Sequence, residues 1–377
     1  MKRWPHSPWP KFLSAFAASA IAVAAVGIAV NYEVDIAHVY RSNSSEQATF
    51  IKKYVAGLNA SKSGRPLPPF ERDVKLELVA AGHADCFVTG SSHELKISRD
   101  GLAGLKTRCH ELVNLAVSGG SFEDFVIMAA VLAERPETRR IYIGISPWFF
   151  RPDADSRYKT YENDYAEARR FFGLADHEVR TGSSAKLLNL INGQYFARNV
   201  AEVVKTVEVG VLGMRDPDDR EKDWQMLQPD GSVTESKAEL RRLNARKGLD
   251  IGPTQKDIGT YKFEGQKADA ALIHDFKTIV AALQQREIAV DFVLSPYHPS
   301  VWACNNAAVC QWLEQMEQHA CAIAQELHVR VIGSFSPAPF GLTWRDFSDD
   351  HHVVRASIPR YWRTGCGAET DLRKFNN

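Results

Sequence analysis

Three polar residues of this chain are of the types that a serine-based active site needs. Ser92 follows the apolar run 86–89 and Gly90, where glycine permits a tight turn into a helix whose first N–H groups can face an anion. Asp349 and His352 lie three residues apart, so one short turn can present both side chains to the same side. A serine hydroxyl becomes a nucleophile when a base takes its proton, an acid orients that base and donors receive the oxyanion. These residue types therefore indicate acyl-transfer chemistry.

Two neighbouring residues near the C-terminus could also serve as the acid and the base. Asp350 and His351 stand between Asp349 and His352, and either could replace its neighbour if the turn is rotated by one residue. We prefer His352, which keeps the three-residue spacing from Asp349.

Five short apolar runs predict the elements that position these residues. They alternate with amphipathic helical segments, the pattern of parallel strands joined by crossover helices. We expect strands over 86–89, 111–117, 140–145, 289–294 and 329–332. Because ligands bind at the carboxyl ends of parallel strands, the residues that follow these strands should face one crevice. Gly119 follows the second strand, and without a side chain it lets substrate approach a backbone N–H.

Residues after the third and fourth strands are candidate substrate contacts. Trp148 is expected in the crevice wall, and Arg151 can bind a sugar or an anionic group, although a solvated charge is the ordinary interpretation. His298 is either a substrate contact or a structural hydrogen-bonding partner at the crevice edge. No cysteine or histidine pair has zinc-ligand spacing, so we expect no metal site.

An uncharged segment near the N-terminus predicts membrane attachment. Phe12 to Val30 has no charged residue and is about as long as a membrane-spanning helix. Lys2, Arg3 and Lys11 precede it and favour a cytoplasmic N-terminus with the body of the protein exported. A cleaved signal peptide is the alternative. We expect an anchor over 1–31, a stalk over 32–75 and a domain over 76–377 with a mostly helical insertion at about 151–287.

Two of the six cysteines form a candidate disulfide. In an oxidising compartment the short interval between Cys304 and Cys310 suits a disulfide, whereas Cys86, Cys109, Cys321 and Cys366 cannot be paired from the sequence.

The charges of the chain balance. Lys plus Arg and Asp plus Glu both number 46, giving a formal net charge of zero. Such a balance argues against nucleic acid as a partner.

Three segments resemble sequence blocks of the SGNH (GDSL-like) hydrolase superfamily. Gly90-Ser91-Ser92, Asn114-Leu-Ala-Val-Ser-Gly119-Gly-Ser and Phe347-Ser-Asp349-Asp-His-His352 look like its first, second and fifth blocks, in the family's order. With Ile145-Ser-Pro-Trp-Phe149 and Ser295-Pro-Tyr-His298, the chain is most similar to the envelope branch containing the D-alanyl-lipoteichoic-acid transfer protein and the alginate O-acetylation proteins.

The resemblance implies a fold and a set of roles. It implies a three-layer α/β sandwich with a central parallel sheet, with Ser92 as nucleophile, His352 as base, Asp349 as its orienting acid, and the N–H groups of Ser92 and Gly119 as oxyanion donors. Two departures stand out: Ser91 replaces the Asp of Gly-Asp-Ser, and Ser146-Pro147-Trp148 stands where the family has Gly-x-Asn.

The resemblance also implies a setting. Members of that branch are tethered by an N-terminal segment and work with a membrane-bound O-acyltransferase. We therefore expect a single-pass protein of the bacterial cytoplasmic membrane with its main domain on the periplasmic side. The expected activity is serine-dependent acyl transfer or ester hydrolysis on an envelope polysaccharide or glycolipid, without a cofactor. The alternatives are a catalytically silent scaffold that assists a membrane acyltransferase or polymer export, and a glycan-binding module. Transfer and hydrolysis are not distinguished by the sequence.

Overall fold

The structure, a computed structural model, describes residues 9–34, 71–152, 161–176, 225–249, 267–302, 307–349 and 351–366, together with 196, 197 and 200. The chain divides into two units. The N-terminal helix α1 (Trp9–Val34) belongs to the first, and every other element named below belongs to the second.

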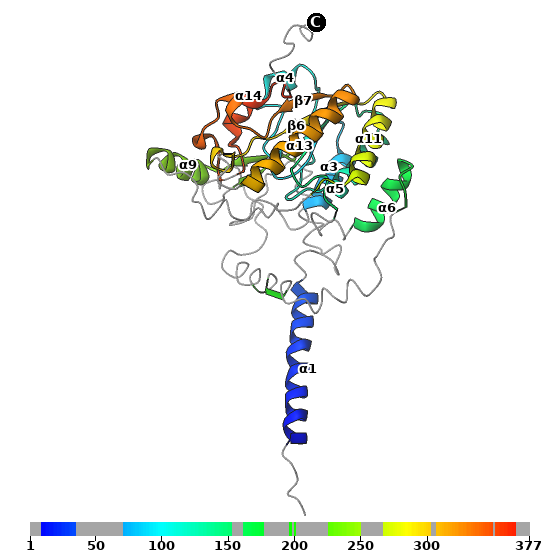
Figure 1. Cartoon of the computed structure of the whole chain (residues 1–377), viewed down its shortest axis with the longest axis vertical. Coiled ribbons are helices and arrows are strands. Elements are labelled where there is room, and N and C mark those ends of the chain that lie inside the picture. The colour runs from blue at the N-terminus through cyan, green and yellow to red at the C-terminus, as the bar shows by residue number, and fades with distance from the viewer. Residues whose placement is uncertain are drawn as a thin grey trace, which may run out of the picture. The chain divides into compact units, whose positions relative to one another are not determined.

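α1 is long and apolar enough to cross a membrane (blue in Figure 1). Its segment Phe12–Glu33 has 22 residues and a mean hydropathy of 2.3. A helix needs roughly 20 apolar residues to cross the hydrocarbon core of a bilayer. The predicted membrane segment is therefore helical over its whole length.

Five parallel strands form the centre of the second unit. They are β1 (Cys86–Thr89), β2 (Leu112–Asn114), β3 (Arg140–Gly144), β6 (Ala289–Leu294) and β7 (Arg330–Gly333). Their order in the sheet is β2-β1-β3-β6-β7. The α/β class and all five predicted strands are confirmed. Because the order reverses direction beside β1, the crevice at the carboxyl ends of β1 and β3 is the expected ligand position.

Helical elements surround this sheet. They are α3 (Glu71–Ala81), α4 (Ala103–Lys106), α5 (Phe122–Ala133), α6 (Glu162–Phe171), α11 (Ala270–Gln285), α12 (Pro299–Trp302), α13 (Ala307–Glu326), α14 (Ile358–Tyr361) and the 3-10 helices η3 (Ala338–Phe340), η4 (Trp344–Asp346) and η5 (Arg355–Ser357). α5 and α11 have side-chain caps: Ser121 and Asp124 form a capping box, and Asp269 accepts from two backbone N–H groups.

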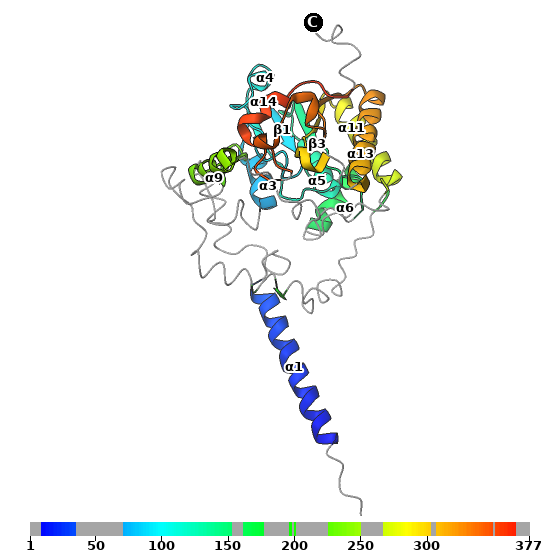
Figure 2. The same cartoon turned by 60° about the vertical axis from the view of Figure 1, so that its left-hand side comes forward.

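Alternating side chains of the strands build one hydrophobic cluster on each face of the sheet. Phe87 and Phe292 pack with residues of α5, α11 and α13. Val88 and Tyr142 pack on the opposite face with residues of α4, η3 and α14. Figure 2 shows α4 and α14 on one side of the strands and α11 and α13 on the other. Each large apolar side chain buried in this way contributes roughly 1.5–3 kcal/mol. These two clusters hold the strand ends, and therefore the loops that follow them, in fixed positions.

The segment 151–287, predicted as a mostly helical insertion, also contains strands. β4 (Gln225–Leu227) and β5 (Val233–Glu235) form an antiparallel pair that is followed by α9 (Lys237–Leu249). The pair is joined to the sheet region, because Asn114 N–H donates to Asp230 O and Val233 N–H donates to Leu95 O. α11, which also lies in this segment, packs on α5 and β6 as a crossover helix. Much of this segment lies outside the described residues, including 177–195, 201–224 and 250–266.

Two disulfides close the segments that carry the candidate site. Cys86 bonds Cys109 across 23 residues, and Cys321 bonds Cys366 across 45 residues. Ser92 lies within the first loop, whereas Asp349 and His352 lie within the second. Cys310 is also disulfide-bonded, and Cys304, its predicted partner, lies outside the described residues.

Removal of either bridge should destabilise the fold. A disulfide restricts the unfolded chain, so we expect Cys86→Ala/Cys109→Ala and Cys321→Ala/Cys366→Ala each to lower the free energy of unfolding by about 3–4 kcal/mol, with the longer loop costing slightly more. Urea unfolding of the full chain in detergent micelles measures this. Unchanged midpoints for both variants would contradict it.

Candidate active site

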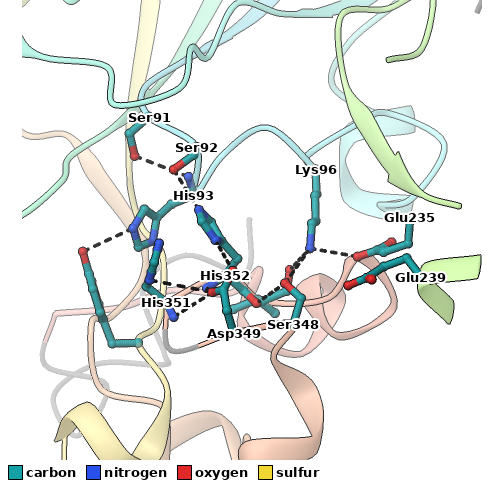
Figure 3. A network of polar contacts seen from close by, with 12 residues as sticks. Ser91, Ser92, His93, Lys96, Glu235, Glu239, Ser348, Asp349, His351 and His352 are labelled. Atoms are coloured by element: carbon teal, nitrogen blue, oxygen red, sulfur yellow. Dashed lines mark hydrogen bonds and ion pairs between the residues drawn. The ribbon is translucent and has the colours of Figure 1, made fainter. Parts of the chain in front are cut away.

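Ser92, His352 and Asp349 form a continuous chain of hydrogen bonds (Figure 3). His352 Nε2 lies 2.8 Å from Ser92 Oγ, and His352 Nδ1 lies 2.7 Å from Asp349 Oδ2. With a proton on Nδ1, the imidazole donates to the carboxylate and accepts from the hydroxyl. The three predicted residues are therefore brought together from the end of β1 and from the segment between η4 and η5, in the arrangement of a nucleophile, a base and an orienting acid.

The turn after β1 exposes Ser92 and buries its neighbours. Ser91 is 0% exposed, while Ser92 is half-buried. The predicted helix directly after Ser92 is wrong: residues 92–96 form successive turns, with Glu94 N–H donating to Ser91 O and Ile97 N–H donating to Glu94 O. Glu94 and Lys96 are buried on this segment, and their side chains make polar contacts with Ser295 and Val353.

Glu94 is the main support of this turn. Its Oε2 accepts from Ser91 N–H at 2.9 Å and its Oε1 accepts from Ser295 Oγ at 2.8 Å, so one carboxyl ties the end of β1 to the end of β6. The carboxyl occupies space left by two glycines, since a Cβ would lie 2.6 Å from Glu94 Oε2 on Gly90 and 2.4 Å from Glu94 Cδ on Gly144. Burial raises the pKa of Glu94 to about 7, against hydrogen bonds from Ser295 and Ser91 that lower it.

Truncation of Glu94 should destabilise the protein. Glu94→Ala leaves a cavity and a buried Ser91 N–H without its acceptor, so we expect the free energy of unfolding to fall by about 3 kcal/mol. Glu94→Gln keeps the shape and one acceptor oxygen and should lose less than half of that. Urea titration of the three proteins compares them, and equal midpoints for wild type and Glu94→Ala would rule out this role.

The acid and the base share one tight loop. Phe347 and Val353 form an antiparallel bridge, and Ser348 N–H donates to His352 O at 2.8 Å. Inside the loop, Asp349 Oδ1 accepts the backbone N–H of His351 at 3.0 Å and of His352 at 2.7 Å. The carboxylate thereby fixes the backbone that carries the imidazole.

Electrostatics keep the acid charged and the base neutral. Burial alone would raise the pKa of Asp349, but the charge and hydrogen bond of His352 hold it well below its usual range. Burial lowers the pKa of His352 below its ordinary value of 6.5, and this effect outweighs the opposing attraction of Asp349. At neutral pH the imidazole is therefore free to accept a proton.

The alternative register is not the one that the structure adopts. His351 Nδ1 lies 3.7 Å from Asp349 Oδ1, farther than His352, and it is His352 that meets Ser92. His351 instead packs with His93, with ring centroids 5.5 Å apart. Asp350 lies outside the described residues.

His93 is buried behind the site. Its ring lies 5.3 Å from that of His352 and its Nε2 lies 3.3 Å from Tyr297 Oη. Burial first, and then the nearby His352 and His351, lower the pKa of His93 well below its ordinary value, so it is a neutral part of the wall.

Gly119 lies in a loop that runs beside the nucleophile turn. Val117 N–H donates to Gly90 O at 3.1 Å, and Gly120 N–H donates to Val117 O at 2.9 Å. Gly119 itself has φ +63°, a left-handed conformation that favours glycine, and it is half-buried. A side chain is thus absent at the point where the loop reaches the surface near the end of β1.

The three residues predicted as substrate contacts have different surroundings in the structure. Trp148 donates from Nε1 to Gly120 O at 3.0 Å and its ring lies 5.8 Å from His93, so it supports the Gly119 loop and the wall. His298 is 3% exposed, with Nδ1 2.6 Å from Ser300 Oγ and its ring against Phe347, the contacts of a structural residue. Arg151 is half-buried, and its backbone N–H donates to Trp148 O.

A group of ligand-type side chains coincides with the candidate site. One ligand atom each of Asp349, His351 and His352 lies within 4.8 Å of the others, close enough to hold a metal ion. Both ring nitrogens of His352 already face Ser92 and Asp349. A metal here would therefore displace the hydrogen bonds of the triad.

Several residues at the site were not predicted from the sequence. Ser146, which stands where the family has its third block, donates from Oγ to Ser91 Oγ at 2.8 Å. Lys96 is 4% exposed and forms an ion pair with Glu235 Oε1 at 2.9 Å. Charged residues normally indicate surface, so only the short distance of Glu94 and Lys96 from Ser92 in the sequence could have drawn attention to them.

Neither a family model nor a curated protein matches this chain.

Proposed function

We propose that this protein is a membrane-anchored, serine-dependent acyl transferase or ester hydrolase of the SGNH type, with Ser92 as its nucleophile. The observation that carries the proposal is the chain of hydrogen bonds from Ser92 through His352 to Asp349, at 2.8 and 2.7 Å. A half-buried serine, an imidazole that is neutral at neutral pH and a carboxylate that is ionised there have the protonation states that nucleophilic acyl transfer requires.

The reaction proceeds through an acyl-serine. As Ser92 Oγ bonds to the acyl carbon, its proton passes to His352 Nε2 and the carbonyl oxygen becomes an oxyanion. When the tetrahedral intermediate collapses, the bond to the leaving alkoxide breaks and His352 returns the proton to it. Water or a sugar hydroxyl then attacks the acyl-serine, with His352 again as base. Asp349 remains ionised and holds Nδ1–H throughout.

The oxyanion donors are the N–H groups of Ser92 and Gly119. The left-handed Gly119 and the proximity of its loop to Gly90 support this assignment. Two backbone donors aimed at the developing charge suffice for such a site. Ser146 takes the position of the missing Asn, but its hydroxyl faces Ser91 and supports the turn.

The N-terminal helix and the disulfides support a setting at the membrane. Two bonded cysteine pairs suit an oxidising compartment, and α1 suits a retained anchor in the bacterial cytoplasmic membrane with the second unit in the periplasm. An anchored enzyme there meets acylated polysaccharides and glycolipids. A membrane-bound O-acyltransferase is the partner that would supply or receive the acyl group.

The proposal predicts the pH dependence of catalysis. The Glu94→Gln variant removes the Glu94 carboxyl, whose pKa of about 7 would otherwise overlap with the titration of His352. In this variant kcat/KM should fall with decreasing pH as His352 becomes protonated. The pKa of His352 is lowered by burial and by the nearby charges of His351 and Lys96, and raised by Asp349, so the midpoint should lie below 6.5. A midpoint above 6.5 would contradict this prediction.

Active-site labelling separates an enzyme from a silent scaffold. The full chain in detergent micelles is treated with a fluorophosphonate, digested and mapped by mass spectrometry. Label on the peptide that contains Ser92 is the expected result, because a phosphonyl group on Oγ mimics the tetrahedral intermediate. Absence of label at Ser92 in folded protein would overturn the proposal and favour the scaffold.

A further inference from the structure

A buried ion pair between two distant segments lies beside the acid and base loop. Lys96, four residues after Ser92, and Glu235, at the end of β5, approach to 2.9 Å (Figure 3). Their side chains are 4% and 5% exposed. Burying two charges costs free energy that only good geometry and further hydrogen bonds offset, so the pair by itself is weak evidence for added stability.

The remaining contacts of Lys96 connect the ion pair to the acid and base loop. Its Nζ donates to Ser348 Oγ at 3.2 Å and to Val353 O at 3.1 Å. Ser348 and Val353 are the residues immediately before and after the segment 349–352. The ammonium group therefore holds both arms of the loop that carries Asp349 and His352, and it does so from the same turn that carries Ser92.

Glu235 orients this ammonium group. It pairs with Lys96 through Oε1 and also accepts Arg355 N–H at 3.0 Å, just after the loop. Burial would raise the pKa of Glu235, but the charge of Lys96 and these hydrogen bonds lower it, so it stays ionised. α9 adds a second contact from the same segment, because Arg242 donates to Ser348 O at 3.5 Å.

We propose that the Lys96–Glu235 ion pair positions Asp349 and His352 against Ser92, which makes the β4–β5 hairpin a structural part of the active site. Lys96 and Glu235 are positioning residues, because neither reaches the reacting atoms. The inference deepens the proposed function and rests on it.

Variants of the pair test this role. Lys96→Met removes the donor to both arms, and Lys96→Met/Glu235→Leu does so without leaving a buried carboxylate unpaired, which protects the fold. Arg169→Met is the matched control, because Arg169 pairs with Asp275 at 2.7 Å with similar burial (9% and 11% exposed) on α6 and α11. Lys96→Arg is the conservative variant.

The measurement is the rate of fluorophosphonate labelling at Ser92, beside urea unfolding and kcat and KM for an acetyl ester. Misplacement of a catalytic group by about 1 Å can cost roughly 100-fold, so both Lys96→Met variants should label about 10- to 100-fold more slowly and lose kcat with little change in KM. Lys96→Arg should be intermediate. Arg169→Met should lose stability and keep the wild-type labelling rate.

The outcomes separate this inference from the function on which it rests. Labelling of the wild type with an unchanged rate in the folded double variant would overturn the positioning role alone. A rate loss in Arg169→Met equal to that in Lys96→Met would also overturn it, since general destabilisation would then explain both. No labelling of wild-type Ser92 would overturn the proposed function and this inference with it.

Discussion

Ser92→Ala should abolish turnover of an activated acetyl ester while leaving the fold intact. Removal of a nucleophile that works with its base as a unit lowers kcat by roughly 10⁴-fold or more. The hydroxyl makes its one hydrogen bond to His352 among the residues that the structure describes, so the free energy of unfolding should change little. The measurement is initial-rate hydrolysis of a chromogenic acetyl ester by the full chain in micelles.

Thr278→Ala provides the matched control for this prediction. Thr278 lies on α11 and its hydroxyl donates to His274 O within the helix, so its removal deletes one hydroxyl far from the candidate site. Wild-type turnover is expected for this variant. Equal turnover by wild type and Ser92→Ala would show that the ester is cleaved elsewhere and would exclude Ser92 as nucleophile.

Asp349→Asn should lower kcat by about 10³- to 10⁴-fold, because it reverses the tautomer of His352. The amide oxygen can keep accepting the backbone N–H groups of His351 and His352 in place of Oδ1. The NH₂ group then faces His352 Nδ1, which must become an acceptor and leaves the proton on Nε2. An imidazole protonated on Nε2 cannot take the proton of Ser92.

Asp346→Asn tests whether this loss is specific. Asp346 is a neighbouring carboxylate at the end of η4. Its side chain accepts hydrogen bonds from Ser357 Oγ and from Arg360. The Asp346→Asn variant should be less stable than the wild type and should keep the wild-type kcat. Measured kcat values and unfolding midpoints for both variants distinguish the roles, and a loss of kcat in Asp346→Asn as large as in Asp349→Asn would contradict the tautomer argument.

The sheet could be predicted because its strands are short apolar runs with clear ends. Cys86–Thr89 and Ala289–Leu294 match the predicted runs residue for residue, since β-strands buried on both faces carry an almost continuous apolar signal. The meeting of Ser92 with Asp349 and His352 was predicted only through the family resemblance. Nothing in the local sequence specifies a contact across 260 residues.

The unpredicted parts are those that depend on buried polar contacts. Glu94 and Lys96 look like surface residues of a helix, but residues 92–96 form turns. The Glu94 carboxyl lies against two glycines and the Lys96 ammonium group contacts both arms of the acid and base loop. Glu235 lies about 140 residues along the chain from its partner, in a hairpin whose three-residue strands give little periodic signal. Such pairings become visible only once the chain is folded.

Capture of the acyl-enzyme tests most directly whether Ser92 is the nucleophile. The full chain in detergent micelles is mixed with an activated acetyl ester, quenched in acid within the first turnover and digested for mass spectrometry. We expect an acetyl group on Ser92 of the wild type, slower accumulation of it in Asp349→Asn, and none in Ser92→Ala. Acetate release without acetylation of Ser92, or acetylation of another residue that persists in Ser92→Ala, would contradict it.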